Sequence, residues 1–370
     1  MTRSRAFAAV VALSLLLAAC GGGSGDEEAT PTAATGPSAA IPNTTPAAEI
    51  NLPDGFTAYA VAQGLNLPTS LALSPDGAVY VSQFGGPIFR LEDSDNDGVF
   101  DRKVEYVAGF FFVNGIAFAP QGPLYVSSRG RVSIVRDTDG DMLGDETEDI
   151  ITDLPNEAHQ NNGIAFGPDG RLYVTNGSTC NECAEEDERS ATILQADLDG
   201  SDLRVYATGL RNPYDLTFNP QGRLWATDNG SDPPCNTIDE LNLIEDGRDY
   251  GWPYSPECDS LQSGTSPSAS LGFNTGSTGI AYYGGEQFPQ AYVGNLFITL
   301  WGSNVQAPKR AGRVLVRAIV DETSGGLEVT VAEFATGFEN PIDVVVDVDG
   351  TLLVLDFTVG KLYRILYTGG

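Results

Sequence analysis

The sequence predicts an all-β protein, a six-bladed β-propeller built from four-stranded blades. A strand–turn–strand unit recurs six times, and turn-forming residues are abundant, with 43 Gly and 22 Pro among 370 residues. Each unit has a short apolar strand, a Pro/Asp/Gly turn and a second strand rich in β-branched and aromatic residues. The turns recur at intervals of roughly 45 to 70 residues, a spacing that suits propeller blades with loop insertions.

The six units predict the first two strands of each blade. Five clear copies span residues 70–82, 115–127, 163–175, 215–227 and 343–355, and a diverged copy with an insertion spans 279–299. Residues 361–367 are expected to form the third strand of the last blade, and residues 56–62 its fourth. This pairing of N- and C-terminal strands closes the ring and removes an exposed sheet edge.

The N-terminal segment predicts export. Arg3 and Arg5 precede an apolar run too short to span a bilayer comfortably, which is typical of a signal peptide over residues 1–20. The run ends at Cys20 in a sequence that resembles a bacterial lipobox, which implies lipidation of this cysteine and anchoring to a membrane. Residues 21–50 have the composition of a flexible linker, and residues 51–370 form the propeller domain. We expect a membrane-anchored lipoprotein at the cell surface or in the periplasm.

The charge balance excludes one class of partner. A formal net charge of −30 without a basic cluster opposes binding to nucleic acid. The excess of carboxylates suits hard cations such as Ca²⁺, or serves solubility alone.

Two acidic loops follow the third strands of the first two blades. Each places carboxylates at loop positions 1, 3, 5 and 9: Asp93, Asp95, Asp97 and Asp101 in one, and Asp137, Asp139, Asp141 and Asp145 in the other. Alternating oxygen ligands of this kind wrap Ca²⁺. The first loop adds Gly98 at position 6 and the second adds Glu148 at position 12. Both loops are candidate calcium sites, and solvated acidic turns are the alternative.

Four cysteines follow Cys20, an even number in an oxidising compartment. Cys235 and Cys258 flank a compact loop and are expected to form a disulfide. Cys180 and Cys183 could form a second disulfide, or a metal or redox pair. Zinc would need two more soft ligands, and the chain has one histidine, so two disulfides are favoured.

That one histidine, His159, lies directly before the first strand of the third repeat. In a propeller, the loop entering this strand points at the central cavity, which makes His159 a candidate catalytic residue. A structural or surface role is the alternative for a lone histidine.

The chain after His159 carries several motifs: Gly177-Ser-Thr-Cys180-Asn-Glu-Cys183, Leu210-Arg211-Asn212-Pro213, Asp228-Asn-Gly-Ser231 and Asp249-Tyr-Gly-Trp-Pro253. Together they resemble the glucose/sorbosone dehydrogenase family, six-bladed propellers that use pyrroloquinoline quinone (PQQ) and Ca²⁺. The resemblance covers roughly residues 55 to 368.

The resemblance implies oxidation of a sugar and an electron acceptor. His159 matches the general base, and Arg211 and Asn212 match positions that contact the cofactor. Arg313 matches a basic position in the fifth blade where the family commonly has lysine. Backbone oxygens near Gly230 and Ser231 match a calcium position.

The chain departs from the family at two cofactor positions. Val113 stands where a glutamine is expected, and Glu339-Asn340-Pro341 stands where arginines are expected. Fewer cations are therefore available for a tricarboxylate cofactor.

Two other functions use the same architecture. Calcium-dependent lactonase propellers place Asn and Asp at the starts of inner strands, as Asn114, Asn162, Asn212 and Asp343 are placed here. The other alternative is a non-catalytic surface propeller, stabilised by calcium, that binds a glycan or a protein.

Overall fold

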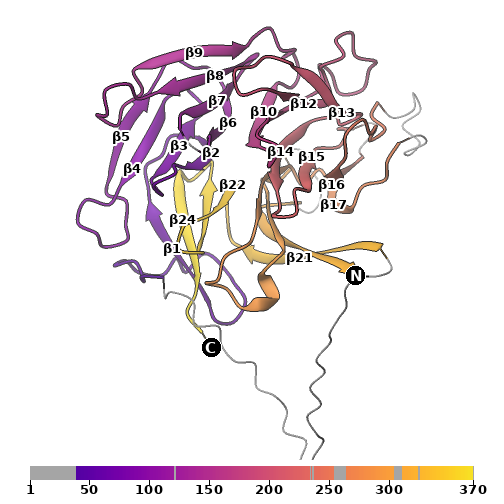
Figure 1. Cartoon of the computed structure of the whole chain (residues 1–370). Coiled ribbons are helices and arrows are strands. Elements are labelled where there is room, and N and C mark those ends of the chain that lie inside the picture. Colours follow the sequence, from indigo (N-terminus) through magenta and orange to yellow (C-terminus); the bar gives the residue numbers. More distant parts are fainter. Residues whose placement is uncertain are drawn as a thin grey trace, which may run out of the picture. The chain divides into compact units, whose positions relative to one another are not determined.

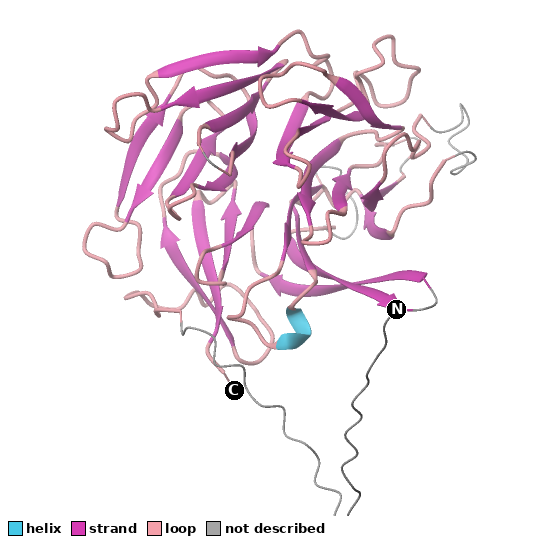
Figure 2. Cartoon of the chain, viewed as in Figure 1, coloured by secondary structure: helices cyan, strands magenta, loops and turns pink. Residues whose placement is uncertain are grey.

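The computed structural model describes residues 39–120, 122–233, 235, 237–253, 264–303, 311–323 and 326–369. Strands form six four-stranded antiparallel sheets, and Figures 1 and 2 show them as blades around a central axis. Among these residues, the only helix is a short 3₁₀ turn, η1 (Gln290–Tyr292). The predicted all-β fold with six four-stranded blades is confirmed.

Each blade runs from an inner strand to an outer strand in sequence order, except the last. The first blade contains β2 (Pro68–Leu73), β3 (Val79–Gln83), β4 (Ile88–Glu92) and β5 (Arg102–Val107), and the second contains β6 (Val113–Phe118), β7 (Leu124–Ser128), β8 (Arg131–Arg136) and β9 (Glu146–Ile151). The third contains β10 (Asn161–Phe166), β11 (Leu172–Asn176), β12 (Thr192–Ala196) and β13 (Arg204–Thr208), and the fourth contains β14 (Pro213–Phe218), β15 (Leu224–Asp228), β16 (Ile238–Ile244) and β17 (Ala269–Phe273). The fifth contains β18 (Ser277–Tyr282), β19 (Leu296–Leu300), β20 (Val314–Thr323) and β21 (Gly326–Thr336).

The sixth blade joins the two ends of the chain. Its order is β1 (Phe56–Ala62), β24 (Lys361–Tyr367), β23 (Leu352–Asp356) and β22 (Pro341–Val346), and β1 and β24 lie side by side in Figure 1. The antiparallel register pairs Phe56 with Tyr367 and Tyr59 with Arg364. The predicted closure is confirmed. It places β24 between two hydrogen-bonded neighbours, β1 and β23.

Inner strands approach one another closely near the axis. A Cβ atom added to Gly115 on β6 would clash with the carbonyl oxygen of Asn162 on β10. One added to Gly163 on β10 would clash with the carboxylate of Asp215 on β14. The repeated glycine at this position is therefore required by the packing of neighbouring blades.

The propeller includes residues before the predicted domain boundary at residue 50. Ala47 and Ile50 are buried in the same cluster as Phe338, and Glu49 forms an ion pair with Lys361 at 2.8 Å. The predicted linker over 21–50 is thus wrong for residues 39–50. A few apolar side chains in a segment rich in Ala, Thr and Pro pack against the closing blade.

Residues 1–38 lie outside the described residues, so the signal peptide, the lipidation of Cys20 and the remaining linker stay predictions. No helix in the described part of the chain is long and apolar enough to cross a membrane.

Ring closure can be tested at Phe56, whose ring makes edge contacts with Phe288, Tyr292, Phe334 and Tyr367. We expect Phe56→Ala to lower the free energy of unfolding by about 2 kcal/mol, because the half-buried ring leaves a cavity at the closure. Phe111, which is 59% exposed, is the control. Phe111→Ala should change stability by no more than about 0.5 kcal/mol. Equal effects in denaturant unfolding would contradict this role for Phe56.

Candidate functional site

Two cavities open at one end of the ring. In each antiparallel blade, the start of the inner strand lies beside the end of the second strand, as Pro213 pairs with Asp228. The first cavity, of about 260 Å³, is lined by Arg211, Asn229, Gly230, Asp232, Asp239, Asn274, Gly276, Trp301, Gly302 and Ser303. The second, of about 290 Å³, is lined by Thr69, Phe84, Asn114, Asn212, Tyr214, Asn229, Gly276, Thr278, Trp301, Ile342 and Phe357. Since Asn229, Gly276 and Trp301 line both, we treat the two as one surface, the mouth.

The two halves of the mouth differ in chemistry. The first contains the charged side chains Arg211, Asp232 and Asp239, whereas the side chains lining the second are aromatic, aliphatic, amide or hydroxyl groups. Aromatic rings continue along the second half. The Trp301 ring centroid lies 6.1 Å from that of Phe357, which lies 6.5 Å from that of Phe84. A planar apolar ring would therefore find aromatic contacts beside an arginine.

His159 is fixed by the loop that follows β11. Its Nδ1 atom lies 2.9 Å from both the carbonyl oxygen and the Oγ atom of Ser178. The hydroxyl of Ser178 donates its own hydrogen to the carbonyl oxygen of Cys180 at 2.7 Å. Both Ser178 oxygens can then only accept from the ring, so Nδ1 carries the hydrogen and Nε2 carries the lone pair.

The imidazole is neutral at physiological pH. Burial, with a smaller contribution from the positive charge of Arg211, lowers the pKa of His159 from 6.5 to about 4. His159 is not among the residues that line the cavities. Gly177 links it to them, because a Cβ atom there would press on both His159 and the side-chain oxygen of Asn212, which lines the second cavity.

Arg211 and Asn212 are held through their backbone by Asp228 at the end of β15. The carboxylate of Asp228 accepts from the backbone N–H groups of Arg211 and Asn212 at 3.0 and 2.7 Å. Asp356, at the end of the second strand of the sixth blade, holds Glu339 and Asn340 in the same way. Sequence reasoning did not assign this role to Asp228. The shared aspartate at the ends of these two repeats was the available signal.

The guanidinium of Arg211 lies on the wall of the first cavity and is 4% exposed. Its Nη2 atom donates to Asn181 Oδ1 at 2.8 Å and lies 3.2 Å from the carboxylate of Asp232. The structure thus brings two of the predicted residues, Arg211 and Asn212, to the mouth. His159 lies near Asn212, with Gly177 between them.

Arg313 and the predicted calcium position lie at the edge of the first cavity. Arg313 forms an ion pair with Glu339 at 2.9 Å and packs on Gly302, which lines the cavity. Within the described residues, its buried Nε atom has no hydrogen-bond partner. Gly230 also lines the cavity, whereas Ser231 is fully buried and its carbonyl oxygen accepts from Thr237.

The asparagines of the lactonase alternative bond to one another. Asn114 Nδ2 donates to Asn162 Oδ1 at 2.9 Å, and Asn162 Nδ2 donates to Asn212 Oδ1 at 3.0 Å. Two of the three amide oxygens thus already accept hydrogen bonds from a neighbouring asparagine. The carboxylate of Asp343 accepts from the backbone N–H groups of Leu71 and Val344. This arrangement favours a structural chain of hydrogen-bonded amides over a shared axial cation.

The acidic loops lie between outer strands, at β4–β5 and β8–β9. Carboxylate oxygens of Asp93, Asp95 and Asp97 lie within 4.8 Å of one another, and so do those of Asp137, Asp139, Asp141 and Asp145. Asp101 is not part of the first group, and its carboxylate accepts from the backbone N–H and hydroxyl of Ser94. Calcium binding at both loops remains a prediction.

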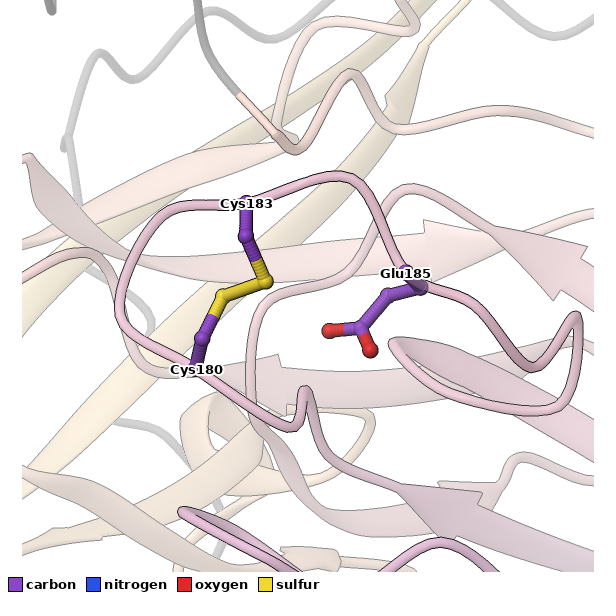
Figure 3. A group of neighbouring side chains, drawn as sticks. All are labelled: Cys180, Cys183 and Glu185. Carbon is purple, nitrogen blue, oxygen red and sulfur yellow. A yellow bond between two sulfur atoms is a disulfide. The ribbon is translucent and has the colours of Figure 1, made fainter.

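Cys180 and Cys183 form a disulfide, drawn in Figure 3 beside Glu185. The two sulfur atoms are bonded to each other. Of the alternatives expected for this pair, the structure shows the disulfide. Cys235 is also disulfide-bonded. Cys258 lies outside the described residues, so its pairing with Cys235 stays a prediction.

Residues 82–358 match the model of a family described as Domain of unknown function (DUF7133). The chain belongs to this family. An uncharacterized protein of Borreliella burgdorferi is 27% identical over 203 residues, 49% of this chain and 53% of that protein. Quinoprotein glucose dehydrogenase B of Acinetobacter calcoaceticus is 38% identical over 72 residues, 16% of this chain and 14% of that protein. The matched part of the chain thus spans about half the length of the first relative and much less of the second.

Solved structures of sugar dehydrogenases are similar along most of the chain. The PQQ-bound form of aldose sugar dehydrogenase from Streptomyces coelicolor has a TM-score of 0.66 at 21% identity, covering 85% of this chain and 99% of that one. The apo-form of the soluble aldose sugar dehydrogenase from Escherichia coli has a TM-score of 0.70 at 19% identity, covering 84% and 99%. At these identities the likeness shows a shared fold.

The lowered pKa of His159 makes stability depend on pH in a defined direction. Above pH 6.5 both folded and unfolded chains hold a neutral imidazole, whereas between pH 6.5 and 4 the unfolded chain binds a proton that the folded chain does not. The folded state therefore loses stability as the pH falls. We expect His159→Gln to gain about 2 kcal/mol over the wild type between pH 7.5 and pH 5. A pH-independent difference in urea unfolding would contradict the lowered pKa.

Proposed function

We propose that this protein is an oxidoreductase that uses PQQ to oxidise a sugar or related alcohol. The observation that carries the proposal is the state of His159. Its ring is neutral, its Nδ1–H is held by Ser178 and its Nε2 carries the lone pair, and only Gly177 separates the residue from Asn212, which lines the mouth. That is the arrangement required of a general base acting at neutral pH.

The residues of the mouth fit PQQ, a planar fused-ring quinone with carboxylates. Trp301 and Phe357 offer aromatic contacts for a flat ring system. Arg211 offers a cation on the wall of the first cavity, and Arg313, which packs on Gly302 at its edge, has a buried Nε donor without a partner among the described residues. The carbonyl oxygen of Gly230 is the candidate ligand for a calcium ion beside it.

The protein's own residues would divide the work. His159 Nε2 would take the proton of the reacting hydroxyl as the carbon is oxidised to a carbonyl. Arg211 would stabilise negative charge that develops in the cavity, and Asn212 would orient the ligand through its amide. PQQ, when bound, supplies the acceptor for the hydride, the hydrogen and two electrons of the C–H bond, that leaves the carbon. The aromatic half of the mouth would exclude water from the reacting atoms.

The comparisons support the reaction class. A quinoprotein glucose dehydrogenase and aldose sugar dehydrogenases are among the similar proteins. A signal peptide and lipidation at Cys20 would place the reaction at a membrane surface, with an electron acceptor there.

Reconstitution tests the proposal. Protein lacking residues 1–20, supplied with Ca²⁺ and PQQ, should reduce an artificial electron acceptor in the presence of an aldose. We expect His159→Gln to lower kcat by roughly 10²- to 10⁴-fold, because the general base is lost. The acid limb of kcat/KM should lie near the pKa of about 4 of His159 and not near 6.5.

Two outcomes would contradict the proposal. One is the absence of a spectral change on adding micromolar PQQ to the wild-type protein. The other is turnover in His159→Gln equal to that of the wild type. Hydrolysis of lactones with Ca²⁺ alone would favour the lactonase alternative instead.

We also propose that the second acidic loop binds Ca²⁺ as a structural ion. Carboxylate oxygens of four aspartates lie within 4.8 Å of one another there, and these charges would repel one another without a cation. Adding Ca²⁺ should raise the Tm, since the ion binds the folded state alone. The double substitution Asp139→Asn and Asp141→Asn should remove most of this rise, whereas Asp169→Asn, outside the loop, should not. An identical calcium response in all three proteins would contradict this site.

A further inference from the structure

The loop after β11 contacts two residues of the mouth, Arg211 and Asp232, through one side chain, that of Asn181. Its Oδ1 atom accepts from Arg211 Nη2 at 2.8 Å and from the backbone N–H of Asp232 at 2.9 Å. Its Nδ2 atom donates to the carbonyl oxygen of Asp232 at 3.2 Å. A single amide therefore joins the arginine of the site to the turn formed by residues 230–232.

The residues on either side of Asn181 reinforce this bridge. Glu182 forms a hydrogen bond with the hydroxyl of Ser231, on the same turn. Upstream, the carbonyl oxygen of Cys180 accepts from Ser178, which in turn holds the ring of His159. The base, the arginine and the turn are all tied to one stretch of six residues, 178–183.

The disulfide fixes the conformation of this stretch. Cys180 and Cys183 flank Asn181 and close a short covalent ring, as Figure 3 shows. Cys180 packs against Ala191 and Trp252, which are buried. At the base of the loop, Glu185 accepts from the backbone N–H of Thr179 at 2.8 Å and from its hydroxyl. The amide of Asn181 is thus held by covalent and polar contacts on both sides.

The direction of the Arg211 side chain depends on this amide more than on its ion pair. The side chain of Asp232 is 59% exposed, and ion pairs with such an exposed partner contribute little to holding a side chain. Arginine loses considerable rotamer freedom when it is fixed, and neutral acceptors hold it here: the Asn181 amide oxygen at 2.8 Å and, at longer distances, the carbonyl oxygens of Asn181 and Asn229 at 3.4 and 3.3 Å. The Asn181 amide is also rigid, since its other bonds already fix its plane.

We propose that Asn181 is the positioning residue for Arg211 and for the 230–232 turn, and that the Cys180–Cys183 disulfide holds it in place. The functional meaning of this role rests on the proposed function, in which Arg211 and Gly230 contact the cofactor and its calcium ion. The geometric role does not depend on it.

The chain provides a matched control. Asn156 holds Arg129 in a similar way, through its carbonyl oxygen and its Oδ1 atom, at 2.8 and 3.1 Å. Neither residue lines the mouth. Asn156→Ala therefore removes an asparagine–arginine side-chain hydrogen bond outside the site and keeps the backbone contact, as Asn181→Ala does.

Hydrogen exchange tests the geometric role without any ligand. In Asn181→Ala, the amide of Asp232 loses its acceptor, so peptides spanning residues 229–233 should exchange faster, by roughly tenfold at that amide. The double variant Cys180→Ser/Cys183→Ser should show the same faster exchange with Asn181 still present. If Asn181→Ala does not fold, this variant alone tests whether the loop positions the 230–232 turn. Asn156→Ala should leave these peptides unchanged. Wild-type exchange in both test variants would overturn the proposal.

Ligand binding tests the functional role. Trp301 lines both cavities, so its fluorescence should report PQQ binding. We expect the affinity for PQQ to fall by roughly tenfold in Asn181→Ala, the loss of one charge-assisted contact, and to stay unchanged in Asn156→Ala. Wild-type affinity in Asn181→Ala would overturn the positioning of Arg211. If the wild type itself binds no PQQ, the proposed function fails, and the exchange measurement alone decides the role of Asn181.

Discussion

The pairing of β1 with β24 is the constraint on which the other features depend. A propeller has no central layer that could hold its blades together, so the ring persists only if the last sheet is completed across the chain ends. Here the seven residues of β1 complete it, and residues 39–50 add a second layer of contacts over the same blade. The mouth draws residues from distant parts of the chain, from Thr69 to Phe357, and exists only when the ring is closed.

Within the closed ring, chemistry is divided between neighbouring blades. The third blade supplies His159 and the disulfide-closed loop, while the fourth supplies Arg211, Asn212 and the turn at Gly230. Backbone anchoring by Asp228 and side-chain anchoring by Asn181 fix Arg211 from two sides. The aromatic residues of the first, fifth and sixth blades complete the opposite wall. Where the family resemblance implies a glutamine, this chain has Val113, and where it implies arginines, this chain has Glu339-Asn340-Pro341, so fewer cations are available.

The fold was predictable because propeller blades repeat a strong local signal. Alternation of apolar strands with Pro/Asp/Gly turns gave the inner two strands of each blade, and the position of residues 56–62 gave the closure. The position of His159 near the mouth was predictable because the residue directly precedes a repeated inner strand. The partners of these residues were not, because Ser178 and Asn181 act through hydrogen bonds between loops that no periodic pattern records. Residues 39–50 were missed because their low-complexity composition hides the few side chains that pack.

The proposed function depends on the state of the His159 ring, which is held as a neutral imidazole with its hydrogen on Nδ1 and its lone pair on Nε2. Because the chain has one histidine, long-range ¹H–¹⁵N NMR spectra of the ¹⁵N-labelled protein at pH 7 give an unambiguous answer. We predict one neutral imidazole in the Nδ1–H form, and Ser178→Ala should retain this tautomer because the backbone carbonyl oxygen of residue 178 still accepts from Nδ1. A protonated imidazolium, or a ring with its hydrogen on Nε2, would contradict it.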